Sequence, residues 1–300
     1  MTAPVYYNRP LDQDFKQFLA DTDAIINELK NDGYRISKAC RFCVFLKEFS
    51  KFQENGFGLG GQPFDIALLV QGMRDASELK AIAKSGKIRN EYRREIQEIL
   101  GGAGKPSDDL LTRSRDYQFQ LYLAAIFDLS GFVVEKLEPD FTFKYEDSTY
   151  SVAAKRISSE LKLNARFSEA KKQIKKSGIS GFIAFSLDRI VWEKIKTDSY
   201  IMTDNPDTLY NAGKTILHDL LRAKGGKAAL TNKNPLVIGH IASLMIPAIL
   251  PRLVSLGFSS TLLFIPSIDV SEESTVYRHI RELPGKMDWP KKGPGRGLEI

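Results

Sequence analysis

Cysteine and histidine are both scarce in this chain of 300 residues. Its two cysteines, Cys40 and Cys43, are too few for a disulfide framework, which fits a reducing cytosol and predicts a cytoplasmic protein. A structural zinc site needs four ligands, and no second cysteine pair could complete one with "ACRFCVF". The neighbours of the two cysteines are apolar at helical spacing, so we expect buried free thiols rather than a redox or metal pair. The three histidines are dispersed and give no basis for a Ser/His/Asp arrangement.

Long apolar runs are missing as well. The N-terminal "MTAPVYYNRPLDQDF" lacks a basic start followed by an apolar core, so we expect no signal peptide. The most apolar stretch, "PLVIGHIASLMIPAILPRLV", is interrupted by a histidine, two prolines and an arginine. Its longest unbroken piece is shorter than the roughly 20 residues that a membrane helix requires. We therefore expect this stretch to lie in a protein core and expect no membrane partner.

The charge balance is moderately positive. The chain has 43 Lys and Arg against 37 Asp and Glu, which gives a formal net charge of +6. With 43% hydrophobic and 27% charged residues, the composition is that of a soluble globular protein. The excess of positive charge permits an anionic partner such as nucleic acid, although charge by itself does not establish one.

The first part of the chain, residues 1–105, predicts a helical region. Apolar residues recur at the helical period through most of it, and no internal repeat is evident. The segment "GGAGKPSDD" at 101–109 has the composition of a linker. Helices are expected at four places: 11–31, 36–52, 63–84 and 88–100.

The second part, residues 106–285, predicts a mixed helix and strand domain. The order is a helix in "LTRSRDYQFQLYLAAIFDLSG", three strands in "FVVEKL", "DFTFKY" and "YSVAAK", a helix at about 158–176, and a buried strand in "GFIAFSL". A further helix in "DNPDTLYNAGKTILHDLLRA" begins with good capping residues. The segments "PLVIGHIASLMI" and "STLLFIP" are expected to extend the sheet, as two strands or as a strand and a helix. Residues 286–300, rich in proline, glycine and basic residues, predict a flexible tail.

Two short motifs resemble phosphate-binding loops but lack the required context. "GFGLGG", from Gly56 to Gly61, follows an expected helix, whereas the dinucleotide fingerprint follows a strand. "AGKT" has Thr208 where a phosphate loop requires glycine, and it lies within an expected helix. Neither motif predicts a nucleotide site.

The segment "EPDFTFKYEDSTYSVAAKR", at 138–156, carries the most chemical information. Asp140 follows Pro139 at the start of the second expected strand, and Lys155 ends the third. The motif and the order of elements resemble the PD-(D/E)XK nuclease superfamily, over about 80 of the 300 residues. The resemblance implies an α/β (α+β) fold, in which a helical N-terminal region precedes a restriction-endonuclease-like αβββαβ core with a C-terminal sheet extension. It also implies Asp140 as a metal ligand and Lys155 as the catalytic lysine.

The chemistry of phosphodiester hydrolysis explains these residue types. A divalent cation stabilises negative charge on the phosphate and lowers the pKa of the attacking water. Mg²⁺ prefers oxygen ligands and retains several waters, and Mn²⁺ could replace it. A neighbouring lysine can orient the water or help to neutralise the phosphate. In the alternative without a catalytic site, Asp140 is a turn residue and Lys155 is a lysine at the end of a strand that reaches water.

The sequence departs from the superfamily pattern at two places. Ala153 stands where the acidic residue of the (D/E)XK element is expected, and the preceding helix offers Gln118 and Gln120 where a glutamate is often found. One subgroup of restriction endonucleases moves the second acid to the following helix, in the pattern PD…K-x13-E. Glu169 lies at that spacing from Lys155, so the resemblance implies Asp140 and Glu169 as the metal ligands. Glu169 as a solvated helix residue remains the alternative.

The helix after Lys155 is rich in cations. A basic helix face beside the hairpin could follow a nucleic-acid backbone, although part of this charge is typical of any solvated face. Gln173 resembles a glutamine that some nucleases of this fold carry on this helix. The residues expected to contact phosphate or to position the site are Arg156, Arg166, Lys172 and Gln173.

The leading functional hypothesis is a Mg²⁺-dependent endonuclease acting on DNA, of a restriction, defence or repair type. The second is a catalytically inactive protein of the same fold that binds nucleic acid or acts as a structural subunit, since Ala153 could mark a lost site. A helical interaction protein without nuclease kinship is a third. The sequence leaves a homodimer open.

Overall fold

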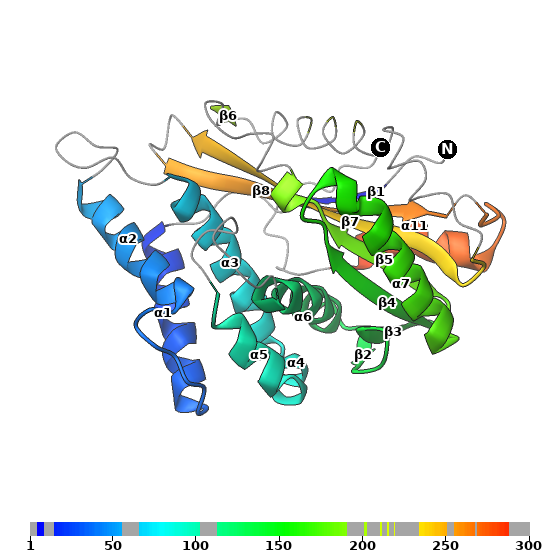
Figure 1. The fold of residues 1–300 in the computed structure, drawn as a ribbon, viewed down its shortest axis with the longest axis horizontal. Helices are drawn as coiled ribbons and strands as arrows, with labels where there is room; N and C mark the ends of the chain where they lie inside the picture. The colour runs from blue at the N-terminus through cyan, green and yellow to red at the C-terminus, as the bar shows by residue number, and fades with distance from the viewer. Residues whose placement is uncertain are drawn as a thin grey trace.

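The structure is a computed structural model of the chain, and it shows a mixed arrangement of helices and strands (Figure 1). It describes residues 5–8, 15–55, 66–102, 113–190, 201–202, 211, 215, 219, 234–250, 255–267 and 269–287. The "GFGLGG" motif, most of the expected linker at 101–109, most of the helix around "AGKT" and the tail after residue 287 lie outside these ranges.

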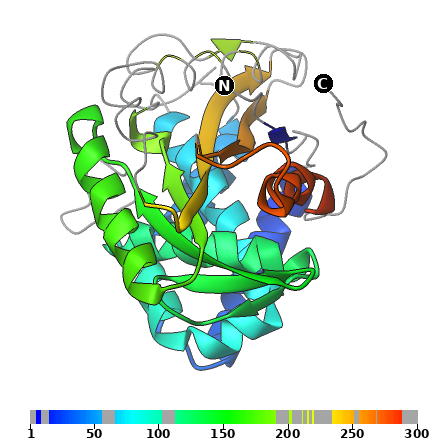
Figure 2. The same cartoon turned by 90° about the vertical axis from the view of Figure 1, so that its right-hand side faces the viewer.

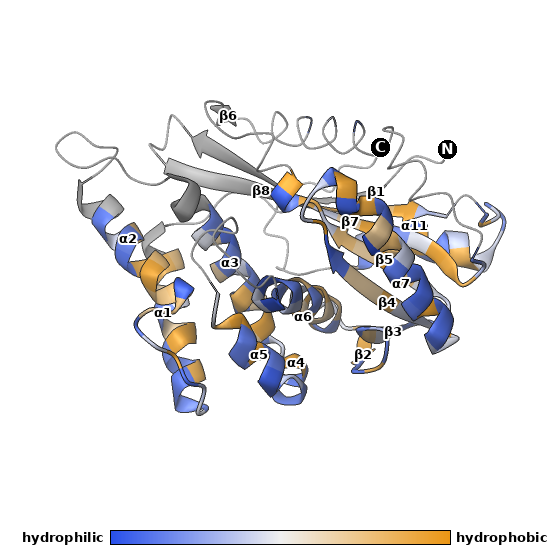
Figure 3. Cartoon of the chain, viewed as in Figure 1, coloured by the Kyte–Doolittle hydropathy of each residue, from blue (hydrophilic) through white to orange (hydrophobic). Residues whose placement is uncertain are grey.

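The described N-terminal part is helical, as the sequence predicts, except for β1 (Val5–Asn8), which joins the sheet beside β8 (Ser255–Pro266). Its longer helices are amphipathic, and Figure 3 shows hydrophilic and hydrophobic stretches along α1 and α2. In α1, for example, Ile25, Ile26 and Leu29 are buried in the core. The bounds of the helices are α1 (Phe15–Asn31), α2 (Arg41–Asn55), α3 (Ile66–Lys84), α4 (Gly86–Glu91) and α5 (Arg93–Ile99).

The prediction of a single helix at 88–100 is wrong in one respect, because the chain forms two short helices there. Tyr92 separates α4 from α5 with φ −115° and ψ 36°, outside the helical range. Its ring is buried, and its hydroxyl donates a hydrogen bond to the backbone oxygen of Asp140 at 3.4 Å. Ser85 caps α4 by accepting from the backbone N–H of Ile88 at 3.1 Å. The break therefore directs an aromatic side chain towards the start of a strand.

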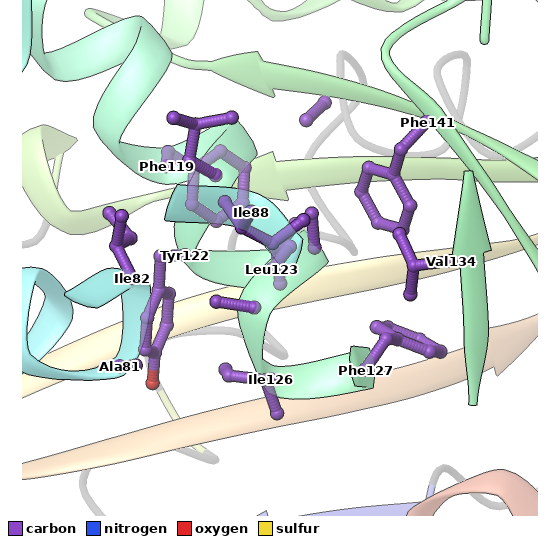
Figure 4. Packing of buried hydrophobic residues seen from close by; sticks show 14 of the residues in the cluster. Ala81, Ile82, Ile88, Phe119, Tyr122, Leu123, Ile126, Phe127, Val134 and Phe141 are labelled. Carbon is purple, nitrogen blue, oxygen red and sulfur yellow. The ribbon is translucent and has the colours of Figure 1, made fainter. Parts of the chain in front are cut away.

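Helix α6 (Arg113–Leu129) lies at the centre of the molecule and is buried on nearly all sides. Figure 4 shows Phe119, Leu123 and Phe127 of α6 packed between the N-terminal helices and the strands. Gly131 follows the helix with φ +90°, the left-handed conformation that glycine tolerates best at a helix end. Side chains of α1 to α6 and of the sheet thus belong to one apolar cluster.

The described strands form one mixed sheet. Its order is β1-β8-β7-β5-β4-β3-β2, and β6 pairs with β7 off this path. The neighbours β2, β3 and β4 are antiparallel, β4, β5 and β7 are parallel, and β7, β8 and β1 are antiparallel. The bounds are β1 (Val5–Asn8), β2 (Val133–Glu135), β3 (Phe141–Tyr145), β4 (Ser148–Arg156), β5 (Gly181–Ser186), β6 (Ile201–Met202), β7 (Val237–Leu250) and β8 (Ser255–Pro266).

Helices cover both faces of this sheet. Helix α7 (Leu163–Ser177), preceded by the short η2 (Glu160–Lys162), packs on one face, and α6 packs on the other. Helix α11 (Thr275–Lys286) lies on the same side as α6, so α7 in green and α11 in red flank the strands in Figure 2. Along β4 the side chains alternate between the two apolar clusters: Ala154 belongs to the α6 side and Ala153 to the α7 side.

Residues 237–250 of the most apolar stretch form β7 in the interior of the sheet, and their burial, described as far as Leu244, agrees with the prediction of a protein core. Val237, Ile238, Ile241 and Leu244 are buried, and β8 accounts for the second expected extension as a strand. Within the described residues, the structure contains no helix with the length and apolar character needed to cross a membrane.

His240 on β7 is buried in an apolar environment, at 1% exposure. Its ring stacks on Phe167 of α7 at 5.6 Å, and neither ring nitrogen has a hydrogen-bond partner. Burial lowers the pKa of His240 to about 3, with a smaller contribution from the charge of Lys171. The imidazole is therefore neutral in the folded protein, whereas in the unfolded chain it takes up a proton near its ordinary pKa of about 6.5.

We expect His240→Leu to reduce the acid sensitivity of the fold. Because the folded-state pKa lies below the unfolded value, the wild type loses stability as the pH falls from about 6.5 towards 3. Between pH 7 and pH 5 this linkage amounts to about 2 kcal/mol, and the leucine variant lacks it. The measurement is the free energy of unfolding by urea at pH 7, 6 and 5. Parallel pH profiles for the two proteins would contradict a neutral, buried His240.

Candidate functional site

Asp140 lies immediately before β3, at the edge of the α7 face of the sheet. Phe141 and Phe143 point into the cluster beneath α6, so strand alternation places Asp140 and Thr142 on the opposite face. The Oδ2 atom of Asp140 accepts a hydrogen bond from the backbone N–H of Ala154 on β4 at 2.7 Å. This hydrogen bond fixes Asp140 against β4 at Ala154, the residue that precedes Lys155.

Lys155 and Glu169 meet on this same face. Lys155 is 8% exposed, although it carries a charge at the end of a strand. Its Nζ lies 3.4 Å from Oε1 of Glu169 on α7, whose side chain is 47% exposed. The other oxygen of Glu169 accepts from Arg166 at 3.0 Å. The thirteen-residue spacing between lysine and glutamate therefore does bring the two side chains together.

The electrostatics of the three groups are coupled. Burial raises the pKa of Asp140 to about 7, while the charge of Lys155 and the hydrogen bond from Ala154 oppose that rise. The charges of Glu138 and Glu169 raise the pKa of Asp140 further, which places Glu169 within electrostatic reach. Burial alone would raise the pKa of Glu169, but Arg166 and Lys155 outweigh it and lower the pKa. The two acids repel one another across a single lysine, an arrangement that a cation would stabilise.

Ala153 explains how the helix can approach. It is completely buried on the α7 face, in the apolar cluster that includes Phe167 and Ala170. In the register of β3 and β4, Phe141 pairs with Val152, so Ala153 follows directly opposite Asp140. A longer acidic side chain at 153 would project into the contact between β4 and α7. The methyl group leaves this space to α7, the helix that carries Glu169.

The donor set fits a hard cation bound largely through water. Asp140 and Glu169 offer carboxylate oxygens, and Mg²⁺ is commonly held by one or two carboxylates while it keeps several waters. On the same face, Oγ1 of Thr142 and, on α7, Oε1 of Gln173 are buried without a hydrogen-bond partner. In the described part of the chain, no three His, Cys, Asp or Glu side chains are grouped so that they could hold a metal ion. A cation here would therefore depend on two carboxylates.

The four residues expected to contact phosphate are divided between two places. Arg166 is half-exposed beside Glu169, Lys172 is exposed on α7, and Gln173 lies one turn after Glu169. Arg156 does not join them. As the neighbour of Lys155 in β4 its side chain lies on the opposite face, where burial and the charges of Arg115 and Arg74 lower its pKa to about 10.

Arg156 belongs to a buried charge cluster between α2, α3, α6 and the ends of β4 and β5. Asp75 accepts hydrogen bonds from Gln71 at 2.8 Å and Gln118 at 3.1 Å and pairs with Arg115, while Arg74 pairs with Glu78 at 2.8 Å and with Asp188. Asp188 in turn accepts from Ser186 at 2.5 Å. The ionisable members of the cluster are Arg41, Arg74, Asp75, Glu78, Arg115, Arg156 and Asp188.

The two glutamines of α6 have separate environments. Gln118 is fully enclosed in the buried charge cluster, where it also accepts from Arg41 and donates to Glu78. Gln120 instead faces a cavity of about 450 Å³ on the other side of Asp140. Gln118 therefore has a structural role in the cluster, and Gln120 is the member of the pair that lies nearer to Asp140.

This cavity opens between α5, α6 and the segment that joins β2 to β3. Among its lining residues, the motif and its departures identify only Pro139, Asp140 and Gln120. The other polar lining residues come from elements whose sequence carries no distinguishing signal, apart from Glu138 in "EPD". The cavity is lined by Tyr92, Glu95, Tyr117, Gln120, Leu121, Ala124, Lys136, Leu137, Glu138, Pro139, Asp140 and Phe141.

The comparisons with known proteins add no relative to this picture. No protein-family model matches the chain, and neither a curated protein nor a solved structure matches it. The chemistry of the site is therefore argued from its own residues.

Proposed function

We propose that the protein is a metal-dependent nuclease that hydrolyses phosphodiester bonds of DNA, with a site formed by Asp140, Lys155 and Glu169. The observation that carries this proposal is the 3.4 Å contact between Lys155 and Glu169 beside the fixed carboxylate of Asp140. A buried lysine beside two carboxylates that repel one another is costly to maintain. Groups with a shifted pKa, such as Asp140, are more frequent at functional sites than elsewhere.

The arrangement of the chain supports the proposal. Helix α6, strands β2, β3 and β4, helix α7 and strand β5 follow one another in the αβββαβ order of the PD-(D/E)XK superfamily. The first three strands are antiparallel neighbours, and β5 is added parallel to β4 after the crossover through α7. In this proposal Asp140 and Lys155 would take the positions that the superfamily uses for its metal ligand and its lysine.

Each side chain has a defined task in this proposal. Asp140 and Glu169 would hold Mg²⁺, or Mn²⁺ in its place. When bound, the cation would neutralise charge on the phosphate and lower the pKa of a water. Lys155, held by the β4 backbone and by Glu169, would direct its ammonium group at the phosphate or at the attacking water. The hydrogen bond from Ala154 keeps the carboxylate of Asp140 oriented towards the α7 face.

The DNA backbone would lie along α7. Apart from Glu169, the charged residues of this helix are basic, and Lys172, Lys175 and Lys176 are exposed. Arg166 would add a further contact close to the site, at the cost of part of its pairing with Glu169. Contacts of this kind are independent of sequence and weaken with salt, since they release counterions from the phosphates.

A cleavage assay tests the proposed function. Purified protein would be incubated with single-stranded and double-stranded DNA and RNA in Mg²⁺, in Mn²⁺ and in EDTA. We expect cleavage of DNA with either cation and none in EDTA. Lys155→Ala should lower the rate by about 10²-fold or more, because it removes a group that stabilises charge in the transition state. Lys47→Ala, an exposed lysine on α2 and away from α7, is the control and should retain activity.

Two results would overturn the proposal. One is the absence of cleavage with every substrate and cation while DNA binding is retained, which would favour an inactive protein of the same fold. The other is cleavage that persists unchanged in Lys155→Ala, which would indicate a contaminating nuclease or a different site.

A further inference from the structure

The cavity beside Asp140 shares a wall with the proposed catalytic site but opens on a different side of it. The backbone oxygen of Asp140 accepts from Tyr92 in the cavity wall, while its carboxylate is held by Ala154 near Lys155. A volume of about 450 Å³ lies within the range of pockets that enclose small organic groups. A group seated here would therefore be adjacent to the scissile phosphate.

Aromatic rings contribute much of the lining. Tyr92 is buried and has the ammonium group of Lys136 over its ring at 4.3 Å from the centroid. Tyr117 is partly exposed and has the guanidinium of Arg113 at 5.4 Å from its ring centroid. Leu121, Ala124 and Phe141 add apolar surface to the wall. Flat aromatic and apolar surfaces of this kind favour a planar ring, because every nucleobase has a face that can stack.

Among the described lining residues of the cavity, carboxylates outnumber cations. Oε1 of Glu95 is bound by Lys136 at 3.0 Å, whereas its Oε2 is buried and has no hydrogen-bond partner. Glu138 and Asp140 add carboxylates, and Lys136 is the one cationic side chain among the described lining residues. This excess of acidic groups disfavours a phosphate inside the cavity. It favours a neutral ring that donates hydrogen bonds, such as a base with an exocyclic amino group, since Glu accepts from the amino group of cytosine.

We propose that this cavity receives an unpaired nucleobase of the substrate, next to the phosphate that is cut. The inference rests on the proposed nuclease function and names its substrate class. The base would stack in the cavity formed by Tyr92 and Tyr117 and donate its amino group to Glu95, while its phosphate faces Lys155. Cytosine, adenine and guanine have such a group, and thymine lacks it.

The proposal has a consequence for strandedness. A base inside a duplex would have to leave the stack to enter the cavity, which costs a few kcal/mol and costs least where it is already unpaired. The preferred substrate is therefore DNA that is single-stranded or mispaired at the point of cleavage. The acidic cavity and the basic α7 lie on either side of Asp140. The neutral base would therefore enter the cavity, and the negatively charged phosphate would face α7.

Binding in EDTA tests the cavity separately from cleavage. The probes are single-stranded oligonucleotides carrying one 2-aminopurine, whose fluorescence falls when it stacks on an aromatic ring, together with oligo-dC and oligo-dT of equal length. We expect quenching with the wild type and tighter binding of oligo-dC than of oligo-dT. Tyr117→Ala should weaken binding about 10-fold or more, because stacking contributes about 1–3 kcal/mol per base. Glu95→Gln should remove most of the dC preference, and Tyr277→Ala on α11 is the aromatic control.

The outcomes distinguish this inference from the function on which it rests. Cleavage that depends on Lys155, with no quenching and no effect of Tyr117→Ala or Glu95→Gln, would overturn the base cavity and leave the nuclease standing. Quenching and a dC preference that both depend on these residues, without cleavage under any condition, would support the cavity and overturn the nuclease. A stronger affinity for fully paired duplex than for single strands would also overturn the cavity.

Discussion

Glu169→Gln should abolish most of the Mg²⁺-dependent cleavage while the protein stays folded. The substitution keeps the size of the side chain but removes one of the two carboxylates of the proposed site. Loss of the charge stabilisation that a bound cation supplies corresponds to several kcal/mol, and at about 1.4 kcal/mol per tenfold the rate should fall on the order of 10³-fold. The measurement is the initial rate of cleavage over a range of Mg²⁺ concentrations, with circular dichroism to confirm the fold.

Glu91→Gln provides the matched control. Glu91 is an exposed glutamate near the end of a helix, 3.9 Å from Lys87, and its side chain is about as exposed as that of Glu169. Its substitution should change neither the rate nor the Mg²⁺ dependence. If Glu169→Gln cleaves at the wild-type rate and needs no additional Mg²⁺, Glu169 is only an ion-pair partner of Lys155 and Arg166. The hypothesis that Glu169 is the second metal-binding acid would then be wrong.

The proposed core could be predicted from sequence because its signals are local. Strand alternation around Phe141 and Phe143, the helical period before Gly131 and the apolar run of β5 each depend on a few consecutive residues. The order from α6 to β5 therefore agrees with expectation, with small shifts at the boundaries. The start of the helix expected at 158 is one such shift, since η2 occupies 160–162 and α7 begins at Leu163.

The candidate site was predictable only in part. The spacing of Lys155 and Glu169 can be read from one short stretch of sequence, whereas the residues around them come from distant parts of the chain. Lys155 and Glu169 follow a fixed interval, and the structure brings them to 3.4 Å. Strand alternation could also have separated Arg156 from Lys155, since neighbouring residues of a strand point to opposite faces. The cavity depends instead on Tyr92, which lies at an unpredicted break between α4 and α5, and on Lys136 from a connecting segment. No short window of sequence contains that combination.

The buried charge cluster is a second feature that short stretches of sequence do not predict. Arg74, Asp75 and Glu78 are charged residues within a helix, a pattern typical of a solvated face. In the structure they are all buried, because α3 packs against α2, α6 and β8. Apart from contacts within α3 itself, such as Arg74 with Glu78, their partners lie far away in sequence, and Arg115 and Asp188 are 40 or more residues away. Burial of a charge becomes evident only once those partners are in place.

Asp75→Ala should destabilise the protein by about 3–5 kcal/mol, the range for removing one partner from a buried ion pair. Burial alone would raise the pKa of Asp75, but the charges of Arg115, Arg41 and Arg74 outweigh it and hold the pKa below its ordinary value. The carboxylate is therefore ionised and balances several buried cations. Its loss would leave an excess of positive charge behind β4, on the opposite face from Lys155. The measurement is the free energy of unfolding by urea at pH 7.

Glu48→Ala is the control, because it removes one partner of an ion pair on the surface instead of a buried one. Glu48 lies 2.7 Å from Lys51 in a solvent-exposed pair on α2, where water screens the charges, so its removal should cost less than about 1 kcal/mol. Asp75→Asn, which keeps the shape and an acceptor oxygen but not the charge, should fall between the two. Equal costs for Asp75→Ala and Glu48→Ala would mean that water reaches the cluster. A large cost that appears only in the alanine variant would mean that shape and hydrogen bonds, rather than charge, hold α3 against α6.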